Sequence, residues 1–223
     1  MRDSVGSAAR EFMSRFEGEL PYMYLDIKGL VTTGIGDLVD PYSVAARLPW
    51  VHRLTGVSAT SQEVFAAWTK VKGAVSMMRV GGGAYEGLTD LRLTYDGLVS
   101  LMMGRLRLDD AFLARRWPGY ASWPADAQLA CLSCAWAAGP AWHAPRLDAA
   151  LALPDFDAAA GPPGDAATHP ECRGEAWLND TSNPGLRPRN LSNKLLFENA
   201  ACVQSLSAMY DPDVLYWPER LSR

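Results

Sequence analysis

The sequence predicts a mainly α-helical protein of the α+β class, with a β-hairpin in a small lobe and a larger helical lobe. Apolar residues recur at helical spacing in residues 4–17, 61–78 and 91–108, the pattern of helices with one buried face. Residues 123–139 are apolar on nearly all sides, as expected for a central buried helix. Residues 22–33, by contrast, combine strand-forming side chains with a turn in their middle.

The composition fits one compact domain with two lobes, or two very small domains. The chain has 223 residues, of which 48% are hydrophobic, and a formal net charge of -4. No run of lysine or arginine is present, so we expect no nucleic-acid partner. No apolar run is long enough to span a bilayer, and the N-terminal stretch MRDSVGSAAREF lacks the apolar core of a signal peptide. We therefore expect a protein that is made in the cytoplasm and does not insert into a membrane.

The cysteines and histidines do not form a pattern typical of a metal or cofactor site. His52, His143 and His169 are isolated in the sequence, and none has ligand-like spacing to another. Cys131 and Cys134 form a C-x-x-C motif, but within an apolar helical run, where cysteine behaves as a small buried hydrophobe. We expect no metal and no cofactor. Two further cysteines can pair if the protein works in an oxidising compartment: Cys172 and Cys202.

Residues 16–37, FEGELPYMYLDIKGLVTTGIGD, hold the strongest candidate site. The predicted first helix ends with Glu17, and Gly18 fits the position that follows a helix end. At a helix C-terminus the backbone dipole disfavours a negative charge. The carboxyl group of Glu17 therefore favours the protonated form that a general acid needs.

A small hairpin follows this helix end. Residues 26–29, DIKG, have the aspartate and the glycine that a turn favours at its first and last positions. They lie between two short segments with strand propensity, so Asp26 and Thr32 belong to one hairpin. Eight residues separate Glu17 from Asp26, and five separate Asp26 from Thr32.

Two carboxyl groups and a hydroxyl in this arrangement suit cleavage of a glycosidic bond. Glu17 can protonate the leaving oxygen, while Asp26 activates water or stabilises the cationic sugar. Thr32 can orient that water. Taken singly, the three residues have simpler explanations, as a solvated helix end, a turn former and a strand residue. Their combination with the nearby glycines favours the functional interpretation.

This stretch resembles the phage-type lysozymes of glycoside hydrolase family 24. The family's catalytic Glu, Asp and Thr, with the same two spacings, fall on Glu17, Asp26 and Thr32. One position departs from the family, because Asp37 stands where a histidine is common. A third carboxylate there can raise the proton affinity of Glu17 or disturb the site. Four further residues match the family's pattern: Tyr24, Gly29, Gly34 and Gly36.

The resemblance implies a single lysozyme-like domain over residues 1–223, with a sugar-binding cleft between two lobes. It places a hairpin lobe at about residues 16–60 and an inter-lobe helix and loop at about 61–88. A helical lobe would follow at about 89–223, with the helix over 4–17 packed on it.

Two distant residues enter the site through the same resemblance. Trp136, at the end of the central helix, would border the cleft, although a role in the core is equally consistent with its position. Arg189 lies where some members have an arginine that pairs with the catalytic glutamate, and Arg187 is the second candidate. The simpler alternative for Arg189 is a cationic helix start on the surface.

The function implied is that of a muramidase, which hydrolyses the β-1,4 bond between N-acetylmuramic acid and N-acetylglucosamine in peptidoglycan. The alternatives are a lytic transglycosylase, which needs the acid but no water base, and a non-catalytic wall-binding module with a decayed site. Without a signal peptide, the protein would reach the periplasm or cell wall through a phage lysis pore or a secretion system. It would act there as an endolysin or as an antibacterial toxin, with an immunity protein or delivery machinery as partners.

Overall fold

The computed structural model describes residues 1–161 and 187–222, and its contacts divide the chain into two compact units. The first, here called the helical unit, comprises Met1–Phe12 and Leu106–Arg223. The second, here called the hairpin unit, comprises Met13–Arg105. Each unit is described by itself below.

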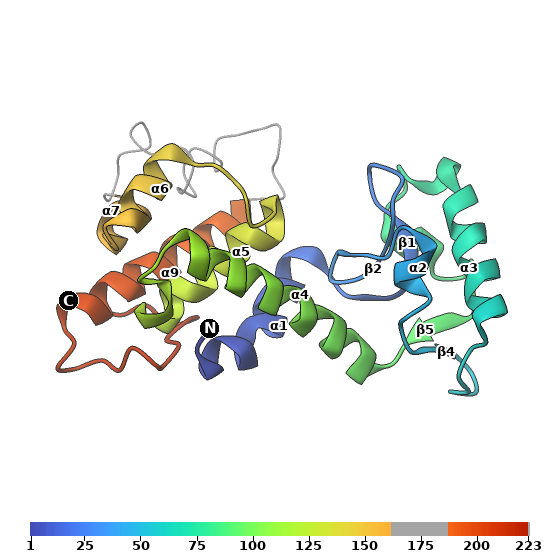
Figure 1. Ribbon diagram of the computed structural model, residues 1–223, viewed down its shortest axis with the longest axis horizontal. Helices are drawn as coiled ribbons and strands as arrows, with labels where there is room; N and C mark the ends of the chain where they lie inside the picture. Colours follow the sequence, from blue (N-terminus) through green and yellow to red (C-terminus); the bar gives the residue numbers. More distant parts are fainter. Residues whose placement is uncertain (162–186, 223) are drawn as a thin grey trace. The chain divides into compact units, whose positions relative to one another are not determined.

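The boundary between the units falls inside two helices. The helix α1 spans Asp3–Glu17, which confirms the predicted first helix, and α4 spans Tyr95–Arg116. Residues 61–88, which were expected to connect two lobes, belong entirely to the hairpin unit. It is α4 that carries the chain from the hairpin unit into the helical unit. The predicted class is confirmed, because the fold is mainly helical with small antiparallel sheets (Figure 1).

The predicted β-hairpin is present, and a third strand extends it. The strands β1 (Leu20–Leu25), β2 (Val31–Gly34) and β3 (Asp37–Leu38) form an antiparallel sheet in the order β1-β2-β3. Tyr24 lies opposite Thr32 in this sheet. The strand β3 could not be predicted, because two residues are too few to show an alternating pattern.

A second sheet occupies residues that the sequence predicted to be irregular or helical. The strand β4 (Trp50–His52) pairs antiparallel with β5 (Leu91–Leu93). The helix predicted over residues 91–108 was therefore wrong at its start, because the first three residues are buried in a strand pair. Trp50 is 2% exposed, and its indole N–H donates to the carbonyl of Ala45 at 2.8 Å. Trp50 therefore anchors this segment to the core of the hairpin unit.

The helix α3 (Ser61–Gly73) begins with a capping box. Thr60 Oγ1 accepts a hydrogen bond from the Glu63 N–H at 3.3 Å, and the Glu63 carboxylate accepts one from the Thr60 N–H at 2.8 Å. The α-helix ends at Gly73, earlier than the predicted Met78, because the chain continues as a tighter 3₁₀ turn. The short elements of this unit are α2 (Tyr42–Ala45), η1 (Val75–Met77) and η2 (Gly82–Tyr85).

The predicted central helix is α5 (Ala125–Ala138), and it is almost completely buried. Pro124 precedes it, and Gly139 follows it with a φ of 84°. The helix α9 (Arg187–Ser205) lies beside α5 in the helical unit (Figure 1). The helix α4 continues without a break through residues 105–116, where the sequence has no glycine or proline. The remaining elements are η3 (Tyr120–Ser122), α6 (Pro145–Ala152) and α7 (Phe156–Ala160).

The C-terminal tail after α9 packs back on the rest of the helical unit. The ring of Trp217 meets that of Phe12 edge-on, with 4.9 Å between the ring centroids. The carboxylate of Asp126 accepts hydrogen bonds from the backbone N–H groups of Tyr216 at 2.9 Å and Trp217 at 3.1 Å. It also accepts one from the side-chain amide of Asn199 at 3.0 Å. Burial raises the pKa of Asp126 above its usual value, although these hydrogen bonds oppose the rise.

Replacing Asp126 with alanine should loosen this tail. Three donors would lose a buried acceptor, and the free energy of unfolding should fall by about 2 kcal/mol. Urea denaturation measures the loss, and hydrogen exchange should show faster exchange at the Tyr216 and Trp217 amides. Asp3→Ala, which removes an exposed carboxylate from the first turn of α1, is the control. Unchanged protection of the two amides in Asp126→Ala would contradict the prediction.

Candidate functional site

Glu17 is the last residue of α1, and its side chain is exposed. The Gly18 N–H still bonds to the Ser14 carbonyl at 3.0 Å, and Gly18 then adopts a φ of 71° that ends the helix. A Cβ added at Gly36 would lie 4.0 Å from a carboxylate oxygen of Glu17. The turn between β2 and β3 therefore passes close beside the carboxylate that was predicted to be the acid.

Asp26 begins the hairpin turn, as predicted. The Gly29 N–H donates to the Asp26 carbonyl at 3.0 Å, and Gly29 has a φ of 74°. The carboxylate oxygen Oδ1 of Asp26 accepts from the N–H groups of Lys28 and Leu30, both at 2.8 Å. These two bonds fix the orientation of the carboxylate. They leave Oδ2 without a donor among the residues that the structure describes, so it can bind water or substrate.

Thr32 lies on β2 and is 4% exposed. Its hydroxyl donates to the carbonyl of Leu30 at 3.1 Å. The oxygen of Thr32 can still accept a hydrogen bond from a water molecule. To donate one to water, the hydroxyl would have to rotate away from Leu30.

The charges of the predicted carboxylates act on the side chain of Tyr24. It is half-buried on β1, and burial is the main reason that its pKa is raised to about 12. The negative charges of three carboxylates add to this rise: Glu17, Asp37 and Asp26. One phenol hydroxyl thus responds to both predicted catalytic carboxylates and to the residue that departs from the family pattern. The fold brings these side chains into one electrostatic environment.

Asp37 is the least exposed of the three carboxylates, at 3%. It accepts a hydrogen bond from the Ile35 N–H at 3.3 Å. Burial raises the pKa of Asp37 to about 6, while the positive charge of Arg105 and the Ile35 hydrogen bond limit the rise. Arg105 also donates to the carbonyl of Gly36 at 3.3 Å. Sequence reasoning missed Arg105, because 69 residues separate it from Gly36 and no local motif links the two.

Lys72, on α3, holds the hairpin turn from another element. Its Nζ donates to the carbonyl of Gly29 at 2.8 Å and to the carboxylate of Asp40 at 2.5 Å. Asp40 also accepts from the Val31 N–H at 3.1 Å. Burial favours the neutral form of Asp40, but these hydrogen bonds outweigh it and hold the pKa of Asp40 below its usual value. Since Gly29 closes the turn that Asp26 begins, Lys72 helps to fix the position of Asp26.

Replacing Lys72 with methionine should therefore destabilise the turn. The Asp40 carboxylate, whose side chain is 13% exposed, would lose its cation, and we expect the free energy of unfolding to fall by about 2 kcal/mol. The Leu30 amide, which binds Asp26, should also exchange its hydrogen faster. Urea denaturation and hydrogen exchange measure the two effects. Lys70→Met removes an exposed lysine from the same helix, and an equal response of the two variants would count against the prediction.

The other two predicted site residues, Trp136 and Arg189, belong to the helical unit. Trp136 is 4% exposed on α5, which is a core position. Arg189 is 2% exposed in the first turn of α9, and its guanidinium donates to the carbonyl and hydroxyl of Ser133 at 3.2 and 3.3 Å. Because Arg189 is buried, the alternative of a surface cation at a helix start is wrong. A pairing of Arg189 with Glu17 stays a prediction.

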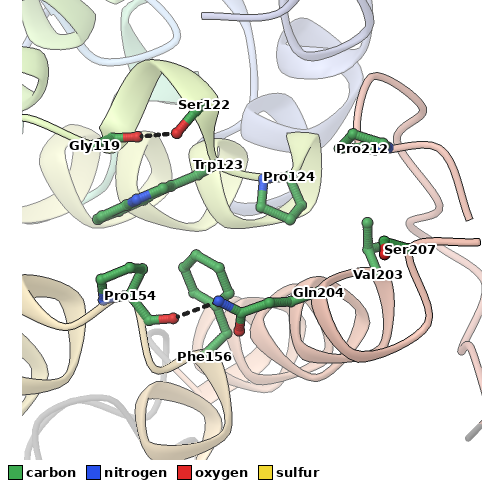
Figure 2. Close-up of a pocket in the computed structure, with 10 residues that line it drawn as sticks. All are labelled: Gly119, Ser122, Trp123, Pro124, Pro154, Phe156, Val203, Gln204, Ser207 and Pro212. Carbon is green, nitrogen blue, oxygen red and sulfur yellow. Dashed lines mark hydrogen bonds between the residues drawn. The ribbon is translucent and has the colours of Figure 1, made fainter.

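A pocket of about 260 Å³ lies within the helical unit, and none of the predicted site residues lines it (Figure 2). Trp123 and Phe156 contribute their rings, whose centroids are 5.4 Å apart. Gln204 donates to the carbonyl of Pro154 at 3.1 Å. The lining is mostly apolar, and it carries no carboxylate that could act on a glycosidic bond.

The cysteines and histidines give no sign of a metal centre in the described part of the chain. No three His, Cys, Asp or Glu side chains gather there in a way that could hold a metal ion. Cys131, Cys134 and Cys202 form no disulfide in the described part of the chain, and Cys172 lies outside the described residues.

Comparisons with known proteins find no family model, no curated protein and no solved structure that matches this chain. Within residues 1–161 and 187–222, no helix is both long enough and apolar enough to cross a membrane.

Proposed function

We propose that this protein is a muramidase, which hydrolyses the β-1,4 bond between N-acetylmuramic acid and N-acetylglucosamine in peptidoglycan. One observation carries the proposal: Glu17 is exposed at a helix end, 4.0 Å from the position of a Cβ added at Gly36, next to the small sheet whose hairpin turn fixes the Asp26 carboxylate. The spacing of Glu17, Asp26 and Thr32, which resembles that of the phage-type lysozymes, supports it.

In the proposed mechanism, Glu17 protonates the glycosidic oxygen as the bond to the leaving sugar breaks. Asp26 activates the attacking water through Oδ2, while Oδ1 stays bound to two backbone N–H groups. Thr32 accepts a hydrogen bond from that water and so orients it. Two fixed N–H donors keep Asp26 in place during the reaction, which reduces the reorganisation needed to reach the transition state.

The finer features of the fold belong to the same proposal. A lysozyme-like cleft would run between a hairpin lobe and a helical lobe, with Trp136 at its border. The chain would reach the peptidoglycan through a phage lysis pore or a secretion system and act there as an endolysin or as an antibacterial toxin. An immunity protein would be a partner in the second case.

Digestion of purified sacculi with mass analysis of the fragments tests this function. A muramidase releases muropeptides with ordinary reducing ends, and we expect these products. A lytic transglycosylase would instead leave anhydro ends, which are one water lighter, and a wall-binding module would sediment with sacculi without releasing fragments. Asp26→Asn should lose hydrolysis, while Asp96→Asn, which removes an exposed carboxylate from α4, should retain it.

A further inference from the structure

The short turn between β2 and β3, residues 34–36, is held by side chains on both sides. Asp37 lies immediately after it and accepts a hydrogen bond from the Ile35 N–H at 3.3 Å. A Cβ at Gly34 would lie 2.8 Å from the Asp37 carboxylate, so only glycine leaves room for the carboxylate to fold back over the turn. The Asp37 carboxylate thus packs directly against the backbone of the turn.

Arg105 binds the same turn from α4. It donates to the carbonyl of Gly36 at 3.3 Å, and its charge acts on Asp37. One guanidinium therefore donates to the backbone of the turn, and its positive charge lowers the pKa of the carboxylate that follows the turn. The opposite charge of Asp37 favours this position of Arg105.

The carboxylate of Glu17 lies next to the backbone that these two residues hold. The Cβ direction of Gly36 points towards Glu17, with 4.0 Å to its nearest carboxylate oxygen. Gly36 has a φ of 80°, so a side chain there would be strained as well as close to Glu17. A shift of the turn would therefore change the space beside Glu17.

We propose that Asp37 and Arg105 are a positioning pair, which holds the turn of residues 34–36 beside Glu17. This inference rests on the proposed function, in which Glu17 is the general acid. Neither Asp37 nor Arg105 needs to touch the substrate, because both act through the backbone of the turn.

The charges around Asp37 give the direction of the pH dependence. Arg105 on α4 and Tyr24 on β1 interact electrostatically with Asp37, and Glu17 lies at the end of α1 close to Gly36. The positive charge of Arg105 attracts ionised Asp37, but burial outweighs this attraction and raises the pKa of Asp37 to about 6. Opening the turn would return the carboxylate to water and lower its pKa, so ionisation of Asp37 favours opening. The turn should therefore be held more tightly below this pH than above it, and Arg105 limits the loosening.

Kinetics of reducing-end release from sonicated sacculi test the pair. We expect Asp37→Asn and Arg105→Gln each to lower kcat at pH 7.5 at least about 10-fold, with KM changed less than about 3-fold. Arg105→Lys should restore part of kcat, and the double variant should be no slower than the worse single variant. Arg107→Gln, an exposed position on α4, is the control.

Hydrogen exchange tests the pair independently of activity. The Ile35 and Gly36 amides should exchange faster above pH 6 than the intrinsic pH dependence of exchange predicts, and this extra step should vanish in Asp37→Asn, which cannot ionise. In Arg105→Gln both amides should exchange faster at pH 7.5 than in the wild type. Thermal unfolding of each variant checks that it is folded. If a variant does not fold, the pH dependence of exchange at the Ile35 and Gly36 amides of the wild type still tests whether Asp37 acts on the turn.

The outcomes separate this inference from the proposed function. Wild-type activity with unchanged kcat in Asp37→Asn and Arg105→Gln overturns the pair and leaves the muramidase proposal standing. A wild type that releases no fragments overturns the muramidase proposal, and the exchange experiment then still shows whether the pair holds the turn. Exchange that is the same in the wild type and both variants overturns the pair in every case.

Discussion

Glu17→Gln should lower the rate of glycan cleavage at least about 100-fold, with little change in the affinity for sacculi. Glutamine has the size of glutamate and forms similar hydrogen bonds, but it cannot donate a proton to the leaving oxygen. Because Glu17 is exposed at the end of α1, the substitution buries no new polar group. Initial rates of reducing-end release at pH 6 to 8, with a sedimentation assay for binding, measure the two quantities.

Glu11→Gln is the matched control for this prediction. Glu11 is an exposed glutamate on the same helix, six residues before Glu17. The control should keep the wild-type rate, because it removes the same charge from α1 away from the turn beside Glu17. Equal rates for Glu17→Gln and the wild type would remove Glu17 from the mechanism, whereas equal losses in both variants would indicate a general effect of charge on wall binding.

Local chemistry allowed the hairpin unit to be predicted in part. Asp26 and Gly29 define a turn through their own backbone preferences, and Gly18 ends a helix in the same way. Such features depend on a few consecutive residues. The strands β4 and β5 could not be found in this way, because they pair across about forty residues and each is only three residues long.

The candidate site, like the hairpin unit, could be predicted only where it depends on residues close together in the sequence. Glu17, Asp26 and Thr32 lie in one stretch of sequence, so their spacing alone suggested a common site. Arg105 and Lys72 reach that stretch from α4 and α3, and a lysine or arginine on a helix has no local signature of its distant partner. Sequence thus indicates the residues proposed to act on substrate, while the residues that hold them in place emerge only from the packing of the helices.

The stability of the protein should fall as the pH rises from about 4 to about 6, because of Asp37. Its ordinary pKa is 3.8, and burial raises it to about 6 in the fold. Below pH 3.8 the carboxyl group is protonated in both the folded and the unfolded chain, so it has no effect. Between the two values the unfolded chain releases the proton and the folded chain keeps it, which favours unfolding. Above about pH 6 the loss is complete.

The size of the effect follows from the difference between the two pKa values. Each tenfold change in proton affinity is worth about 1.4 kcal/mol, so the full loss is about 3 kcal/mol. The free energy of unfolding of the wild type, measured by urea denaturation from pH 3.5 to 7.5, should fall by this amount relative to Asp37→Asn. The asparagine cannot ionise, so its difference from the wild type isolates the titration of this one carboxyl group.

Asp96→Asn provides the comparison, because it removes an exposed carboxylate from the helix that also carries Arg105. Its difference from the wild type should change little over the same range. A constant difference between Asp37→Asn and the wild type would mean that solvent or Arg105 offsets the cost of burying the charge. The proposed positioning pair and this prediction are connected at one point: ionisation of Asp37 reduces the stability of the fold, and the attraction of Arg105 only limits this loss. A protein that loses about 3 kcal/mol at neutral pH by burying a charged carboxylate directly after the turn beside Glu17 is consistent with a functional role for that charge.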